Sequence, residues 1–195
     1  PLTLNAYKNT PSEVAELASM SMELLTMNTW DAYFDDSQLL NRAKSEQLEG
    51  ILGTLPWIAQ VDAFQHWIYE NPTHSTAERT AKWLELCARF GSGEVDYSNL
   101  ESALENSWHK QLHIFEVPFY YIEYGFAQLG AVGVWKNYIT KGQAAIDDYK
   151  AFLKLGNTKS IPNIYETAGV KFEFSESYIN DLMQFVQVEL AAIHN

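Results

Sequence analysis

Helical periodicity recurs in nearly every long segment of the chain, and this pattern restricts it to a helical architecture. In residues 38–55, apolar side chains follow one another at helical intervals: Leu39, Leu40, Ala43, Leu48, Ile51, Leu52 and Leu55. The pattern resumes after Pro56, so we expect one long helix, kinked or broken at 53–56, that ends at Asn71–Pro72. No segment alternates clearly in the manner of a strand, and no internal repeat is present. The sequence therefore predicts one all-α unit over residues 1–195.

Capping and breaking residues place the remaining helices. Ser75, Thr76 and Glu78 are typical of a helix start, and Gly91 of a helix end. Pro162 marks a turn region before the last helix. Besides the long helix, we expect helices over 11–25, 75–90, from 98 or 99 to about 108, after 118, 143–155 and 175–193. Three glycines in the helix expected after 118 would allow close helix contacts: Gly125, Gly130 and Gly133.

Composition limits the possible partners. The chain has 195 residues, of which 47% are hydrophobic, enough for a well-packed core. Its net charge of -12 leaves no basic stripe for a nucleic acid. We expect no membrane partner either, because no apolar stretch approaches the length of a span. Cys87 is the single cysteine, so no internal disulfide can form, which fits a reducing, cytoplasmic location. Within its amphipathic helix, Cys87 is expected to be a small hydrophobe.

Two carboxylates lie near the start of the first helix, in TPSEVAELASMSMELL. A capping box with Thr10 as N-cap, Pro11 as the first helical residue and Glu13 at the third position would account for Glu13. Glu16 has no such role. It shares a face with Glu13 among apolar residues, and is either a solvated residue or a ligand directed into a site.

Histidines and tyrosines form the second group of candidates. His109 and His113 are four residues apart and could bind a metal from one helix. However, Lys110 stands at the position where a metallopeptidase motif has its general-base Glu. The favoured interpretation is therefore one solvated and one buried histidine. His66, beside Phe64 and Trp67, is expected in the core.

The tyrosine-rich stretch FYYIEY follows His113. Tyr120 and Tyr124, or Tyr121 and Tyr124, would share a helix face. An aromatic stripe more often belongs to a core, yet phenols beside an imidazole are also neutral donors that can stabilise an oxyanion.

The segments NAYKNTPSEVAELASMSMELL and HIFEVPFYYIEYGFAQLGA together resemble the C-terminal part of the oligoendopeptidase F group, within the thimet-oligopeptidase-like family of zinc metallopeptidases. The resemblance extends through the whole chain, including VDAFQHWIYENP. It implies that Glu16 is the third zinc ligand and that Glu13 supports it. It also implies that His113 binds substrate with Tyr120, Tyr121 or Tyr124, a choice that the spacing leaves open. Glu16 and this cluster are then expected to line one cleft.

The family's His-Glu-x-x-His motif, which provides two zinc ligands and the general base, is absent from this sequence. The resemblance therefore implies the C-terminal portion of a catalytic domain whose motif helix lies upstream, in an N-terminal remainder of the same protein. The whole enzyme would use zinc-activated water to cleave short peptides, and this chain alone is predicted to be inactive. The alternative is a non-catalytic helical protein that binds peptides or acts as a scaffold.

Overall fold

Helices and connecting loops make up the computed structural model, which describes residues 2–194, and no strand occurs among these residues. The prediction of an all-α fold is confirmed. No helix in the described part of the chain is long and apolar enough to cross a membrane. The elements are η1 (Asn5–Lys8), α1 (Ser12–Thr26), η2 (Met27–Ala32), α2 (Ser37–Glu70), α3 (Thr76–Phe90), α4 (Glu101–Glu105), η3 (Ser107–Lys110), α5 (His113–Glu116), α6 (Ile122–Lys141), α7 (Gln143–Leu153), α8 (Ile161–Thr167) and α9 (Glu176–Ile193).

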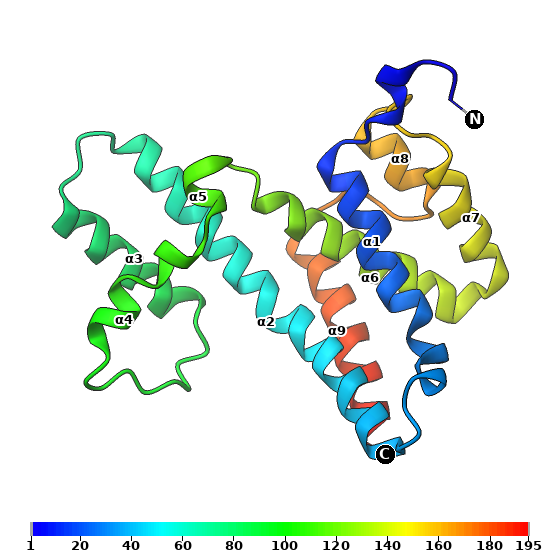
Figure 1. Cartoon of the computed structure of the whole chain (residues 1–195), viewed down its shortest axis with the longest axis horizontal. Coiled ribbons are helices and arrows are strands. Elements are labelled where there is room, and N and C mark those ends of the chain that lie inside the picture. Colours follow the sequence, from blue (N-terminus) through cyan, green and yellow to red (C-terminus); the bar gives the residue numbers. More distant parts are fainter. Residues whose placement is uncertain (1, 195) are drawn as a thin grey trace. The chain divides into compact units, whose positions relative to one another are not determined.

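These elements form two compact units. The first unit contains residues 2–52 and 126–194, and the second contains residues 53–125. Each boundary falls inside a helix, at Gly53 in α2 and at Gly125 in α6. Figure 1 shows the helices of each unit.

In the first unit, α6 packs closely against α1 and α8. A Cβ atom added to Gly130 of α6 would lie 2.7 Å from Cε1 of Tyr165 and 2.8 Å from Cδ1 of Leu17. Leu17 and Tyr165 are both fully buried. The expected close helix contact at Gly130 is confirmed, and the missing side chain is what allows it. On α7, the Tyr149 hydroxyl donates to the carbonyl oxygen of Ala18 at 2.9 Å and attaches that helix to α1.

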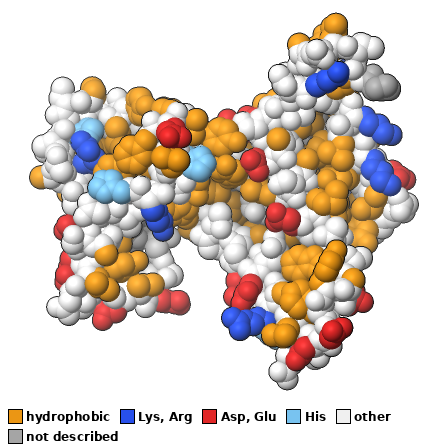
Figure 2. All heavy atoms as spheres, viewed as in Figure 1, with side chains coloured by type: hydrophobic (Ala, Val, Ile, Leu, Met, Phe, Trp, Pro, Cys, Tyr) orange, Lys and Arg blue, Asp and Glu red, His pale blue; other side chains and the backbone are white. Residues whose placement is uncertain are grey.

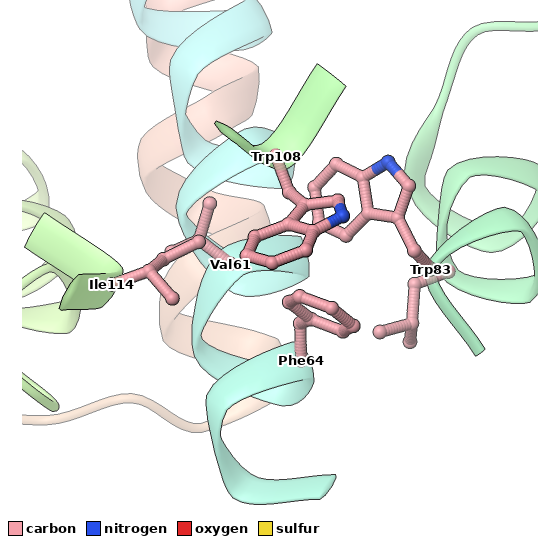
Figure 3. Close-up of a cluster of buried hydrophobic side chains, with 6 residues drawn as sticks. Val61, Phe64, Trp83, Trp108 and Ile114 are labelled. Atoms are coloured by element: carbon pink, nitrogen blue, oxygen red, sulfur yellow. The ribbon is translucent and has the colours of Figure 1, made fainter. Parts of the chain in front are cut away.

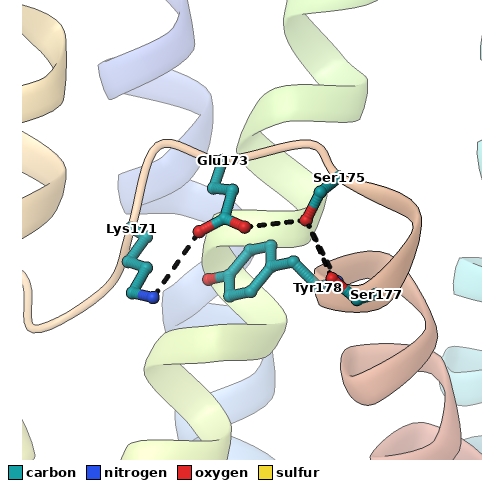
Figure 4. Close-up of polar contacts among 5 residues, drawn as sticks. All are labelled: Lys171, Glu173, Ser175, Ser177 and Tyr178. Atoms are coloured by element: carbon teal, nitrogen blue, oxygen red, sulfur yellow. Dashed lines mark hydrogen bonds and ion pairs between the residues drawn. The ribbon is translucent and has the colours of Figure 1, made fainter.

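The start of α9 is fixed by a small polar network, shown in Figure 4. The Ser175 hydroxyl accepts a hydrogen bond from the backbone N–H of Tyr178 and donates to Oε1 of Glu173 at 2.7 Å. Lys171 lies 3.5 Å from the other carboxylate oxygen of Glu173. The Ser175 hydrogen bond is the main reason that the pKa of Glu173 is lowered. This network defines the N-terminus of α9 at the position that the sequence predicts.

The second unit has an aromatic core between α2, α3, η3 and α5, shown in Figure 3. Trp83 is fully buried, and its ring lies edge-on to Phe64 at 4.9 Å between centroids. Its indole N–H donates to the Leu104 carbonyl and to the Ser107 hydroxyl, at 3.1 and 2.9 Å. These bonds hold the connection between α4 and η3 against the core. The buried members are Val61, Phe64, Trp83, Leu86, Trp108 and Ile114.

Helix α2 continues through Pro56 over 34 residues, so a break at 53–56 does not occur. A proline inside a helix costs about 3 kcal/mol because it removes a hydrogen bond and crowds the preceding turn. Buried residues on both sides of Pro56 offset this cost by packing: Leu48 and Ile51 before it, and Ile58 and Val61 after it.

Two other local expectations are wrong. The region of Pro162 forms α8, in which proline occupies the first turn, where its missing N–H is not needed. The helix expected from 98 or 99 to 108 is divided into α4 and η3, because the chain turns at Asn106. It also begins later than expected, since Leu100 and not Ser98 or Asn99 precedes the first helical residue. In contrast, Ser75 and Glu78 form the expected capping box at the start of α3.

Candidate functional site

The candidate site in the second unit is built on short elements and a tight turn. His113 begins α5, which ends at Glu116 with Val117 as its C-cap. Phe119 has a φ of 62°, in the left-handed region, and the N–H of Tyr120 donates to the Val117 carbonyl at 3.1 Å. The chain thus turns back before α6 begins at Ile122. The expectation that these tyrosines share a helix face is wrong for Tyr120 and Tyr121, which precede α6.

The turn nevertheless brings three tyrosine rings against one histidine. The His113 ring lies 5.8 Å from Tyr120, 5.1 Å from Tyr121 and 5.6 Å from Tyr124, measured between centroids. The Tyr124 ring is also 5.4 Å from each of the other two. We call these four residues the His113 cluster. All four side chains are half-buried. On the face of the second unit shown in Figure 2, histidine atoms (pale blue) lie among hydrophobic ones (orange).

Each ring nitrogen of His113 has a hydrogen-bond partner. The Nδ1 atom is 2.6 Å from Nε2 of Gln111, and the Nε2 atom is 3.3 Å from the Tyr124 hydroxyl. The other end of the Gln111 amide accepts a hydrogen bond from the indole N–H of Trp57, at 3.3 Å. A chain of polar contacts therefore runs from α2 through Gln111 to the imidazole.

The surroundings of Trp57 restrict its movement. The Trp57 ring is edge-on to Trp83 at 5.7 Å, and the ammonium group of Lys110 lies 4.3 Å from its centroid. Burial raises the pKa of the Tyr121 hydroxyl, and the nearby Trp57 N–H opposes part of that rise. Tyr121 therefore stays a neutral donor at physiological pH.

The other histidines do not join this cluster. His109 lies in η3, so it does not share a helix with His113 in α5. Its ring is tilted against that of Trp108, at 4.0 Å between centroids. His66 is 59% exposed, which contradicts its expected core position; its ring lies beside Asp62 and Phe119. Within residues 2–194, no group of three or more His, Cys, Asp or Glu side chains is placed to hold a metal ion.

Glu13 and Glu16, the two candidate carboxylates of α1, lie in the first unit. The backbone N–H groups of Val14 and Ala15 both donate to the Pro11 carbonyl, so Pro11 is the N-cap. The predicted capping box is therefore wrong. Glu13 is at the second helical position, where its negative charge still interacts favourably with the positive end of the helix dipole. Neither Thr10 nor Pro11 provides a side-chain cap.

Glu16 is half-buried beside the fully buried Leu17, and its side chain has no hydrogen bond or ion pair with any described residue. It belongs to the first unit and the His113 cluster to the second. Their expected position along one cleft stays a prediction.

Sequence reasoning did not identify Gln111 and Trp57. Gln111 is only two residues from His113, and in a non-helical segment a side chain at that separation can reach the ring. Nothing local indicates Trp57, which is 54 residues away from Gln111.

Comparison with known proteins gives one family. A model of Peptidase family M3 matches residues 3–184. No curated protein matches the chain.

Solved structures similar to this one share its fold over almost the whole chain. One, assigned as an oligoendopeptidase F, is 29% identical, with a TM-score of 0.84 over 96% of this chain and 33% of its own. Another of that assignment, from Bacillus anthracis str. Ames, is 28% identical, with a TM-score of 0.76 over 96% and 30%. PZ peptidase A with an inhibitor is 28% identical, with a TM-score of 0.80 over 95% and 33%. The chain thus spans about a third of the length of these proteins.

Proposed function

Because the chain belongs to Peptidase family M3, we propose that it is part of a zinc metalloendopeptidase that hydrolyses short oligopeptides. The observation that carries this proposal is the contact of one imidazole with three phenols, at 5.1 to 5.8 Å between ring centroids. The similarity to structures assigned as oligoendopeptidase F supports it. In this proposal the His113 cluster binds the carbonyl oxygen of the scissile peptide bond.

Glu16 fits the role of a zinc ligand. Its side chain is partly buried, and its carboxylate has no hydrogen bond or ion pair with a described residue, so it is available to bind a metal ion. Catalytic zinc uses three protein ligands and leaves one position open, so one carboxylate does not complete a site. We propose that the other ligands come from an N-terminal remainder of the same protein, because the matched structures are about three times longer. Glu13, one turn before Glu16, would support its position.

The zinc, when bound, would polarise the carbonyl and lower the pKa of a water molecule. The residues of this chain have a different task. As negative charge builds on the carbonyl oxygen, a ring N–H of His113 and a tyrosine hydroxyl donate hydrogen bonds to it. The benefit appears mainly in the transition state, because the ground-state carbonyl carries less charge.

Peptide cleavage by the whole protein that contains this chain tests the proposal. We expect a quenched fluorescent peptide to be hydrolysed, hydrolysis to stop with a chelator, and activity to return with zinc. Peptide binding without cleavage would overturn the proposal in favour of a helical peptide-binding or scaffold protein. A cytoplasmic location remains a prediction that rests on the single cysteine.

A further inference from the structure

The hydrogen bonds around Gln111 determine which nitrogen of His113 carries the proton. An indole N–H can only donate, so the amide atom that faces Trp57 must be the carbonyl oxygen Oε1. With Oε1 directed to Trp57, the amide NH₂ group faces His113 at 2.6 Å. Because an amide nitrogen is only a donor, Nδ1 of His113 must accept and cannot carry a hydrogen.

We infer that Gln111 is a positioning residue that holds neutral His113 in the tautomer protonated at Nε2, and that Trp57 sets the orientation of the amide. The inference rests on the proposed function for its catalytic meaning, but the tautomer itself can be measured without any activity. The Nε2 atom is the one that faces the tyrosines, 3.3 Å from the Tyr124 hydroxyl. The fixed proton therefore lies on the side where the oxyanion would form.

The alternative tautomer would remove this donor. A proton on Nδ1 would oppose the amide NH₂ group, and Nε2 would present a lone pair to the developing negative charge. To remove the conflict by rotation, the amide would have to turn its NH₂ group toward the Trp57 N–H, which is a donor as well. The packing of Trp57 against Trp83 and Lys110 resists a movement of the indole away from the amide.

Substitutions at both positions separate this role from simple packing. Gln111→Glu keeps the shape of the side chain but replaces the donor with an acceptor, so it should transfer the His113 proton to Nδ1. Gln111→Leu removes the donor, and Trp57→Phe removes the group that orients the amide; both should give a mixture of tautomers. Gln187→Glu on the exposed surface of α9 makes the same change in charge and is the matched control.

Nuclear magnetic resonance of the full 195-residue chain with ¹⁵N-labelled histidine reports the tautomer directly. The measurement is made above about pH 8, where an ordinary histidine is neutral, and His113→Gln assigns the signals of His113. We expect the proton on Nε2 in the wild type and in Gln187→Glu, and on Nδ1 in Gln111→Glu. Far-UV circular dichroism checks that each variant is folded. A wild-type proton on Nδ1, or an unchanged tautomer in folded Gln111→Glu and Trp57→Phe, would overturn the inference.

Kinetics of the whole peptidase then test the catalytic meaning separately. We expect Gln111→Glu to lower kcat by about 10²-fold, because the Nε2–H donor to the developing oxyanion is lost. The KM and the zinc content should change little. If the tautomer changes as expected but kcat does not, the positioning role stands and the proposed catalytic role of His113 is wrong.

Discussion

Tyr165 donates its hydroxyl hydrogen to the backbone carbonyl oxygen of Glu13 at 3.4 Å, and so connects α8 to the first turn of α1. Burial is the main reason that the pKa of Tyr165 lies far above its usual value, and the negative charge of Glu13 adds to the rise. The phenol therefore remains a donor at any physiological pH. This contact restrains the helix turn that leads to Glu16.

The close approach at Gly130 gives a prediction about stability. Gly130→Ala should lower the free energy of unfolding by about 1–3 kcal/mol, because the new methyl group would overlap with Tyr165 and Leu17. Gly50→Ala is the matched control, since a Cβ atom there meets nothing within 4 Å in the interior of α2. That change should raise the free energy of unfolding by about 0.5–1 kcal/mol. Urea unfolding of both variants measures the difference, and equal stabilities would contradict this packing.

The proposed ligand role of Glu16 predicts a loss of metal. In the whole protein, Glu16→Ala should lower zinc content together with activity, because a ligand of the ion is lost, and added zinc should restore part of both. Glu49→Gln, an exposed carboxylate of α2 in the same unit, should leave zinc content unchanged. Metal analysis of the purified variants measures the effect. Normal zinc content in folded Glu16→Ala would exclude a ligand role.

The His113 cluster should affect turnover and not metal binding. His113→Ala, and Phe at whichever of Tyr120, Tyr121 or Tyr124 faces the substrate, should lower kcat by about 10²–10³-fold. The KM should rise far less, and zinc content should remain normal. Replacing each tyrosine singly identifies the donor, since a merely structural tyrosine should lose stability and not turnover. Near-normal kcat in all four variants would remove the cluster from catalysis.

The 195-residue chain by itself should be inactive. It offers one candidate zinc ligand, so we expect no stoichiometric tight zinc and no hydrolysis of a quenched peptide. Metal analysis and the peptide assay on pure chain test this. Chelator-sensitive cleavage by the chain alone would show that it does not depend on ligands from elsewhere.

Cys87 should react slowly with alkylating agents. Burial raises the pKa of its thiol, although the Gln60 amide, which donates to the sulfur at 3.1 Å, opposes part of the rise. A raised pKa means less thiolate at a given pH, and the thiolate is the reactive form. At about pH 8, near the pKa of a free thiol, the folded chain should react much more slowly than the chain unfolded in urea. Similar rates would show that burial does not control the thiol.

The sequence by itself determined the helical character of this protein and the ends of several helices. Apolar periodicity and capping residues act over a few positions, so Ser75 with Glu78 and Ser175 could be identified as helix starts without the fold. Gly130 could be identified as a contact point for the same reason: a small residue in an apolar helix allows a neighbour to approach. Local patterns also drew attention to His113 and the three tyrosines.

Tertiary structure alone decided how those side chains are arranged. Pro56 stays inside α2 because buried residues on both sides pack strongly enough to offset its local cost. Tyr120 and Tyr121 lie before α6, in a turn that a left-handed Phe119 makes possible, and no helical spacing describes that turn. The contact between Trp57 and Gln111 joins residues 54 positions apart. Local patterns cannot encode such a pairing, because it forms only when α2 and the segment before α5 pack on the same aromatic core.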